Sequence, residues 1–196
     1  MMIRRMVFSR NRYFHGRLLT ASDFEAEQDY LRDKQQFRNL HTHGVGIVSG
    51  LSVKTRDAGK ALYISSGFAI DRLGREICVP STVECALPAK SDRLLVCLGY
   101  AETEANPTPS LRNEATNEGS PAEYARIEEG YEVTFTPIPR GRRSGPQPIL
   151  PSQSEHSALI PLAVLQRKGM RWVVESSPRR PRMKSARTKP MKGKSR

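Results

Sequence analysis

The 196-residue chain has few cysteines and no long apolar run. Its three cysteines, Cys78, Cys85 and Cys97, form no CxxC pair, and an odd number of them does not close a disulfide framework. No stretch approaches the roughly 18 consecutive apolar residues that a membrane-spanning helix needs, and the first residues lack the apolar segment of a secretory signal. We therefore expect cytoplasmic synthesis in a reducing compartment, and no membrane span.

The sequence also lacks the short motifs that mark common active sites: it contains no GxSxG elbow, phosphate-binding glycine loop or HExxH. The acidic residues between Asp23 and Asp33 follow the pattern of a solvated helix face and not that of two converging carboxylates. His15, His41 and His43 have no carboxylate or cysteine at a metal-ligand spacing. We expect no catalytic, cofactor-binding or metal-binding residues, and a protein that is not an enzyme.

Positive charge is concentrated at one end of the chain. The net charge is +12, and residues 178–196 contribute nine Lys/Arg and no acidic residue, which leaves +3 for residues 1–177. A segment of this composition cannot bury enough apolar surface to fold, so we expect a disordered basic tail. Such a tail attracts phosphates by releasing counterions, which predicts weak, non-specific contact with nucleic acid or an anionic surface. Its basic residues are Arg179, Arg180, Arg182, Lys184, Arg187, Lys189, Lys192, Lys194 and Arg196.

The clearest local pattern is a helix start at Thr20. Thr20 is a suitable N-cap, Asp23 stands where its reciprocal capping partner belongs, and Leu19 and Phe24 have the spacing of a hydrophobic staple. The pattern predicts a helix over about residues 21–41. The helix leads into the sequence HTHGVG, whose glycines permit a sharp change of direction.

Apolar residues form two separate ridges on this helix. Phe24 and Leu31 lie on one ridge, and Tyr30 and Phe37 lie on the other. A helix with two apolar ridges contacts two things, of which one is the β-structure that follows in sequence. The other is a second copy of the chain, a different partner, or the N-terminal arm folded back. A polar stripe, expected to be solvated, separates the ridges and consists of Glu25, Asp29, Arg32, Gln36 and Asn39.

The N-terminal arm, residues 1–17, is basic and carries aromatic residues. It is too short to fold alone, and its aromatic side chains either dock onto a neighbouring surface or fill the edge of the chain's own core. Together with the second helix ridge, the arm supplies the candidate interaction residues Phe8, Tyr13, Phe14, Tyr30 and Phe37.

After the helix the apolar period changes from about 3.6 to 2 residues. Short alternating segments, separated by turns, predict antiparallel hairpins from Val45 to Leu87. The sequence RLLVCLGYA, residues 93–101, is apolar on both faces and is predicted to be the central strand. Residues 124–136 and a hairpin of residues 158–165 and 171–175 complete a mainly β, α+β fold. We expect an antiparallel sheet or sandwich built from hairpins, with the helix packed on it.

These patterns define the expected domain organisation. A single β-rich domain spans residues 18–177, preceded by the arm, residues 1–17, and followed by the disordered basic tail, residues 178–196. Two segments rich in Pro, Asn, Ser and Gly, residues 102–122 and 140–156, are predicted to be mobile surface loops.

Several segments occur together in an informative order: YFHGRLLTASDF before the helix, GFAIDRLGREI in a predicted hairpin, and YAETEANP at a strand end. In this combination the chain resembles, over about Arg12–Phe135, a family of bacterial proteins from phage-tail-like and contractile injection system gene clusters. The hinge HTHGVGIVSG and the basic tail differ from the family pattern.

The resemblance implies a small structural component, associated with a baseplate or tail fibre. Its expected partners are other particle proteins and further copies of itself, in a particle released from or anchored in the cell. The charge distribution supports an alternative, in which the chain is a nucleic-acid or anionic-surface binding module that acts through its basic tail.

Overall fold

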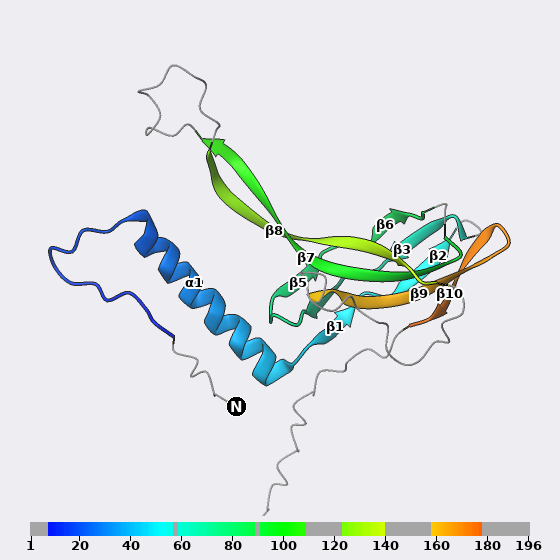
Figure 1. The fold of residues 1–196 in the computed structure, drawn as a ribbon, viewed down its shortest axis with the longest axis horizontal. Helices are drawn as coiled ribbons and strands as arrows, with labels where there is room; N and C mark the ends of the chain where they lie inside the picture. Colours follow the sequence, from blue (N-terminus) through cyan, green and yellow to red (C-terminus); the bar gives the residue numbers. More distant parts are fainter. Residues whose placement is uncertain (1–7, 57–58, 89–90, 109–122, 140–157, 178–196) are drawn as a thin grey trace, which may run out of the picture.

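A computed structural model of the chain describes residues 8–56, 59–88, 91–108, 123–139 and 158–177. In these residues the chain forms one α-helix with a π-helical end, followed by ten β-strands (Figure 1). The predicted mainly β, α+β class is confirmed. The elements are α1 (Ala21–Arg38), η1 (Asn39–His43), β1 (Gly46–Gly50), β2 (Val53–Arg56), β3 (Ala61–Ile64), β4 (Gly67–Ile70), β5 (Glu76–Val79), β6 (Val83–Ala86), β7 (Arg93–Thr108), β8 (Glu123–Pro137), β9 (Ile160–Lys168) and β10 (Arg171–Ser176).

The predicted helix is confirmed, and its last turn is widened into a π-turn. The helical segment runs through α1 and η1 to His43. The hydroxyl of Thr42 donates to the carbonyl of Arg38 at 2.5 Å within this turn. Gly44 then adopts a φ of +79°, a conformation that glycine reaches without steric cost, and the chain turns into β1.

The first six strands form two three-stranded antiparallel sheets that join at a corner. β1 pairs with β4 and β4 with β5, while β2 pairs with β3 and β3 with β6. The two halves are continuous across a corner, where the amide of Leu51 donates to Ser66 at 3.2 Å and the amide of Ser65 donates to Ser52 at 3.0 Å. Leu51 has a φ of +54° at this corner. The predicted antiparallel hairpins are therefore present, bent into two short sheets.

The remaining strands form a second, four-stranded sheet in the order β10-β9-β7-β8. β7 is an interior strand between β9 and β8, as its continuous apolar run predicted. Buried side chains from this sheet and from the bent strands meet in one core, so the body is a β-sandwich. The core consists of Ile47, Leu51, Leu62, Ile64, Ala69, Ile77, Val79, Leu94, Val96, Leu98, Ile160, Leu162, Leu165 and Trp172.

β7 and β8 extend beyond the sandwich as a two-stranded ribbon. β9 pairs with β7 only as far as Leu98, whereas β8 pairs with β7 as far as Thr108. We call residues 99–108 and 123–132 the ribbon. The prediction of a mobile loop from residue 102 is therefore wrong for residues 102–108, which are strand. Their backbone groups pair with β8 even though their side chains have almost nothing to bury.

Other predictions concern parts of the chain outside the described residues. These parts are residues 109–122 of the first predicted loop, the second predicted loop at 140–156, residues 1–7 of the arm and the basic tail at 178–196. In the described part of the chain, no helix combines the length and apolar character needed to cross a membrane.

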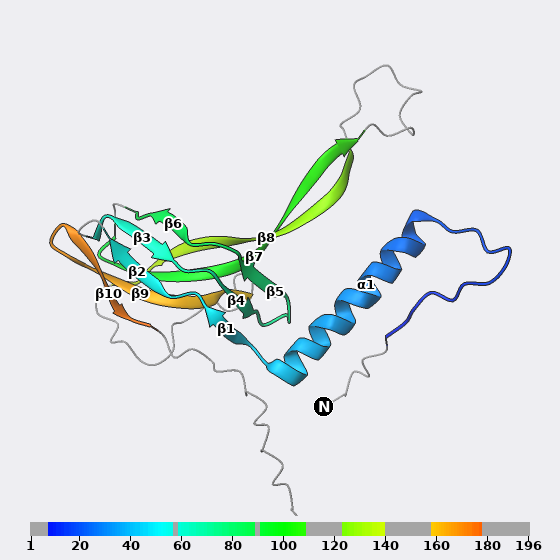
Figure 2. The same cartoon turned by 180° about the vertical axis from the view of Figure 1, so that it is seen from behind.

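α1 and the ribbon both project from the body, toward the same side of the molecule (Figures 1 and 2). None of the residues of α1 is buried. The helix meets the body at its C-terminal end, beside the turn between β4 and β5, so its packing on the sheet is less extensive than we expected from the sequence.

Candidate functional site

One buried asparagine fixes the end of the helix to the turn between β4 and β5. Asn39 is 3% exposed, and its side-chain amide donates to the carbonyl of Gly74 at 2.9 Å and to Oε1 of Glu76 at 3.0 Å. A buried polar group is tolerated only when it is hydrogen-bonded, so these bonds specify how the helix meets the body. The sequence pattern assigned Asn39 to a solvated stripe; that assignment is wrong because the helix meets the body at this residue.

The same turn is held by a buried carboxylate. Asp71 accepts hydrogen bonds from the amides of Leu73 at 2.8 Å and Arg75 at 2.9 Å, and pairs with Nε of Arg75 at 2.6 Å. Bonding to the amide two residues ahead is the usual way in which aspartate stabilises a turn. These bonds compensate the buried charge and hold the turn in one conformation. The helix, through Asn39, is therefore bound to a well-defined loop.

Gly74 permits close contact between this turn and the helix. Its φ is +85°, and a Cβ atom added to it would lie 2.4 Å from the carbonyl oxygen of Gln36. Real Cβ atoms do not approach an oxygen so closely, so any side chain at this position displaces the helix. We call Asn39, Asp71, Gly74 and Glu76 together the joint.

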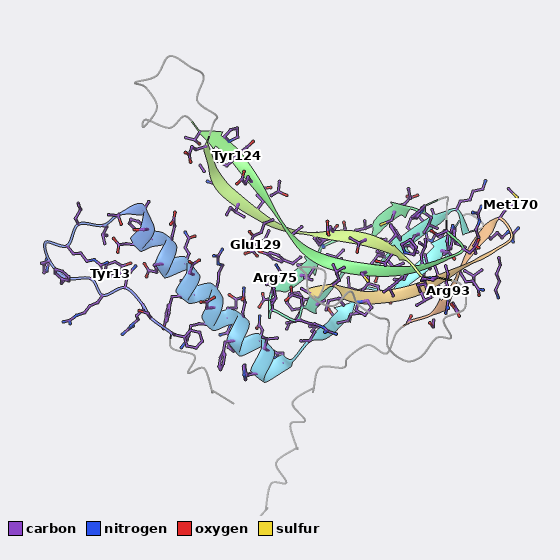
Figure 3. The ribbon with its side chains drawn as sticks, in the orientation of Figure 1. Tyr13, Arg75, Arg93, Tyr124, Glu129 and Met170 are labelled. Carbon is purple, nitrogen blue, oxygen red and sulfur yellow. The ribbon has the colours of Figure 1, made fainter. Side chains whose placement is uncertain are left out.

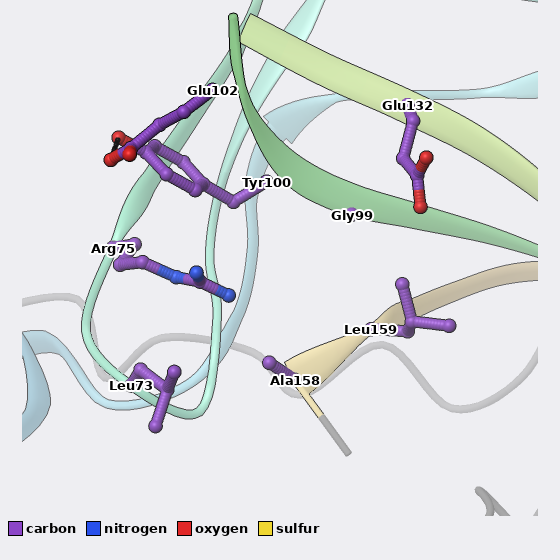
Figure 4. A pocket seen from close by; sticks show the side chains of 8 residues that line it. All are labelled: Leu73, Arg75, Gly99, Tyr100, Glu102, Glu132, Ala158 and Leu159. Atoms are coloured by element: carbon purple, nitrogen blue, oxygen red, sulfur yellow. Dashed lines mark hydrogen bonds between the residues drawn. The ribbon is translucent and has the colours of Figure 1, made fainter. Parts of the chain in front are cut away.

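Arg75 connects the turn to the ribbon. The carbon of its guanidinium lies 4.6 Å from the centroid of the Tyr100 ring, a cation–π contact (Figure 4). The hydroxyl of Tyr100 donates to Glu102 at 2.8 Å. Burial raises the pKa of Tyr100, and the hydrogen bond to Glu102 and the charge of Glu129 raise it further. At the base of the ribbon, Tyr100 thus lies between the cation of Arg75 and the carboxylates of Glu102 and Glu129.

Two open hollows flank this stack, with volumes of about 480 Å³ and about 300 Å³. The larger one is drawn in Figure 4, where Arg75 lies below the Tyr100 ring and Glu132 lies on the other side of Gly99. Charged side chains line much of both hollows, unlike the mostly apolar pockets that hold small molecules. The smaller hollow is lined by Arg32, Asp33, Gln35, Gln36, Gly74, Arg75, Glu76, Tyr100, Glu102 and Glu129.

The N-terminal arm folds back along α1. The rings of Phe8 and Phe37 meet edge to face, with centroids 5.5 Å apart. The ammonium nitrogen of Lys34 lies 5.3 Å from the centroid of Phe8 and 5.8 Å from that of Tyr30. The sequence left open whether a second copy, a different partner or the folded-back arm covers the ridge of Tyr30 and Phe37. In the structure the arm contacts this ridge.

Polar contacts fasten the other end of the arm. The hydroxyl of Tyr13 donates to Glu27, and the guanidinium of Arg17 pairs with Asp23. Asp23 also accepts hydrogen bonds at the helix start, from the amide of Thr20 at 3.0 Å and from its hydroxyl at 2.9 Å. The bonds from Thr20, and then the charge of Arg17, lower the pKa of Asp23. The predicted pairing of Thr20 with Asp23 is thus present.

The ridge of Phe24 and Leu31 remains uncovered in the described part of the chain. These side chains are 52% and 60% exposed. The arm adds further exposed apolar groups beside the free end of the helix, including two of the predicted interaction residues, Tyr13 and Phe14. We call the exposed set the helix–arm surface; it comprises Tyr13, Phe14, Leu18, Leu19, Phe24 and Leu31.

Reactive side chains are dispersed. Cys97 is buried beside Leu95 and Leu159, and burial raises the pKa of its thiol to about 12. Cys78 lies at the surface and Cys85 is half-buried. Among the described residues, no three His, Cys, Asp or Glu side chains are grouped so as to hold a metal ion.

The sequence identified the arm and the helix ridges but missed the joint. A turn was predicted at residues 71–74, DRLG, yet its role in seating the helix depends on Asn39, which is more than thirty residues away in the chain. One signal was present, since the GFAIDRLGREI segment that carries the family resemblance contains Asp71, Gly74 and Glu76.

Solved structures similar to this chain include two baseplate assemblies. One is the baseplate complex from the type VI secretion system, 14% identical, with a TM-score of 0.43; the match covers 87% of this chain and 58% of that one. The other is the TssK-TssF-TssG baseplate subcomplex of the type VI secretion system, 14% identical, with a TM-score of 0.44; it covers 90% of this chain and 62% of that one. The chain thus spans less than two thirds of either. No family model matches the sequence, and no curated protein matches it.

Proposed function

We propose that the chain is a non-enzymatic structural component of a phage-tail-like, contractile injection system particle, associated with its baseplate or fibre. Its partners are other particle proteins, bound through the projecting helix and arm. The motif order over Arg12–Phe135 supports the kind of particle. The observation that carries the binding role is an 18-residue helix with no buried residue and an exposed ridge of Phe24 and Leu31.

The physical argument starts from the instability of free helices. Isolated helices of this length are only marginally stable in water, and most helices in proteins are stabilised by packing an apolar face. α1 instead has a capped start, the folded-back arm and the joint, and its Phe24 ridge faces solvent. Contiguous exposed apolar side chains on a soluble protein mark an interaction surface. A partner covering this ridge supplies the packing that the chain does not.

The test uses the native host and substitutions that spare the core. Particles are sedimented, and the fraction of the chain that co-sediments is measured by quantitative mass spectrometry. We expect Phe24→Ser with Leu31→Ser to reduce this fraction strongly, because the ridge contacts the neighbouring protein. The control is Met170→Ser, a substitution of a still more exposed apolar residue at the far end of the body (Figure 3).

Two results would contradict the proposal. One is that the chain co-sediments with no assembly; the other is that the double variant is incorporated as well as the wild-type chain. Unfolding does not confuse the test, because the sandwich core contains no residue of α1 or the arm. Circular dichroism of the purified variants checks that the β-body is retained.

A second candidate function follows from the nine basic residues in residues 178–196. In this alternative the chain binds nucleic acid or an anionic surface through the tail. The binding is expected to weaken steeply with salt and to disappear when residues 178–196 are deleted. Binding to a DNA duplex that is insensitive to salt, or absent at low salt, would contradict it.

A further inference from the structure

The ribbon is an unpartnered two-stranded sheet. Beyond Leu98, in the described part of the chain, β7 has β8 as its pairing partner and no strand on its other side. All described residues from Glu123 to Gly130 are exposed, including the large apolar side chains of Ile127 and Tyr124. Tyr124 lies near the tip of the ribbon (Figure 3). A two-stranded ribbon is marginally stable on its own in water. Contact with a further group would therefore stabilise the ribbon.

One face of the ribbon concentrates negative charge. Glu102 and Glu129 are directly opposite each other in the strand register, and Glu104 follows on the same face, opposite Ile127. Like charges at opposed positions destabilise an antiparallel pair. Over residues 102–108 and 123–130 the ribbon carries five glutamates and one arginine. Arg32 and Arg75 line the hollow beside Glu102 and Glu129, and a partner that contributes further cationic side chains to this face reduces the remaining repulsion.

We propose that the occupant of this face is the chain's own basic segment, residues 178–196, whose Lys and Arg side chains lie across Glu102, Glu104 and Glu129. The segment has nine basic residues and no acidic one, so its charge complements that of the ribbon. A second ribbon is a poor occupant because it repels the first. The arginine of the arm nearest the helix, Arg17, already pairs with Asp23.

The length of the segment permits this contact within one chain. β10 ends at Ser176, which lies two strands from Leu95 in the register, and Glu102 is about 23 Å farther along β7. The 19 residues from 178 to 196 span up to about 60 Å when extended, which is more than this separation. Pro178, Pro181 and Pro190 lack the amide hydrogen that strand addition requires. The contact is therefore one of charged side chains on the ribbon face, and not an added β-strand. This inference concerns the chain alone and does not depend on the proposed function.

The experiment compares amide chemical shifts of four full-length forms by NMR. The first is the wild type, the second carries serine at all nine basic positions of the segment, the third carries Glu102→Lys and Glu129→Lys, and the fourth combines the changes of the second and third. At about 0.01 M salt, where the Debye length is about 30 Å, we expect the ribbon amides of the second form to differ from those of the wild type. The difference should vanish at about 1 M salt, where the Debye length is about 3 Å.

Comparison of the third and fourth forms separates binding to the ribbon from general effects of charge. Placing the serine-substituted segment in the Glu102→Lys, Glu129→Lys background should no longer move the ribbon amides, because the docking face is lost. The matched control is Glu84→Lys on β6, an exposed acidic position on the body, which should leave the response intact. Unchanged amide shifts for Leu62 and Leu98 show that the core remains folded in every form.

Two outcomes overturn the proposal. If serine substitution of the segment leaves the ribbon amides unmoved at low salt, the segment does not lie on this face. If the shifts depend on protein concentration, the occupant is a segment of a second copy and the intramolecular assignment is wrong. Neither outcome bears on whether the helix–arm surface binds a particle protein, so the two proposals fail separately.

Discussion

The sandwich body and the helix that projects from it are stabilised in opposite ways. The body buries a continuous set of aliphatic side chains from two sheets, and Leu62, Ile64 and Leu98 are fully inaccessible. The helix buries none of its residues and is held by a capped start, a folded-back arm and one asparagine. Burial of apolar area is the dominant stabilising term in folding. The body is therefore expected to fold without the helix, while the position of the helix is set by a few polar contacts.

The largest expected difference is between matched apolar truncations in the two regions. Leu98→Ala removes a fully buried side chain and should lower the free energy of unfolding by about 2–5 kcal/mol. Phe24→Ala on the exposed ridge should change it by less than about 0.5 kcal/mol, as for other surface sites. Denaturant unfolding followed by tryptophan fluorescence measures both, since Trp172 belongs to the core. A similar cost for the two variants would show that the ridge is part of the core.

The next largest effect concerns the joint. Asn39→Ala leaves the carbonyl of Gly74 and the carboxylate of Glu76 without their donor, and should weaken docking of the helix by about 1–3 kcal/mol. Faster amide hydrogen exchange in α1, with unchanged exchange in β7, is the expected signature. Gln35→Ala, an exposed neighbour, is the control. Equal exchange in both variants would mean that the joint does not hold the helix.

A smaller, pH-dependent effect is expected at the helix start. The pKa of Asp23 is lowered by its bonds with Thr20 and by Arg17, so its contribution is complete above the ordinary aspartate pKa of about 4 and is lost as the pH falls through the lowered value. Amide exchange in the first turn of α1 should therefore accelerate below about pH 4. Asp23→Asn should remove this pH dependence; its persistence in the variant would assign it to another group.

The smallest effect is spectroscopic. The pKa of Tyr100 is raised by burial and by Glu102 and Glu129, so the phenol should ionise later than an ordinary tyrosine in an ultraviolet titration. Because the folded chain keeps this proton when the unfolded chain has lost it, stability should decrease as the pH rises above about 10. Glu102→Gln should move the ionisation to lower pH, whereas Glu84→Gln should not. An unaltered titration in the first variant would show that the carboxylate does not act on this phenol.

Sequence patterns predicted the body better than the projections, for a physical reason. Alternation identifies a strand only when one face is buried, as in Trp172 and Val173 of β10, and a continuous apolar run identified the interior strand β7. Residues 102–108 bury little on either face, so they resembled a loop even though they pair with β8 along one edge. Asn39 followed the helical period of a solvated stripe, and only the distant turn at Gly74 buries it.

β7 passes without interruption from the core into the ribbon, which has a mechanical consequence. The strand is 16 residues long, about 53 Å at the usual rise of a strand. A pull on its tip along the strand axis loads the β7–β9 ladder from Arg93 to Leu98 in shear, so that its hydrogen bonds resist together. A pull on the helix loads the two hydrogen bonds of Asn39 and, once they break, the backbone that leads through Gly44 into β1. A pull on β7 is thus opposed by several hydrogen bonds acting together, whereas the contact of the helix with the turn yields first.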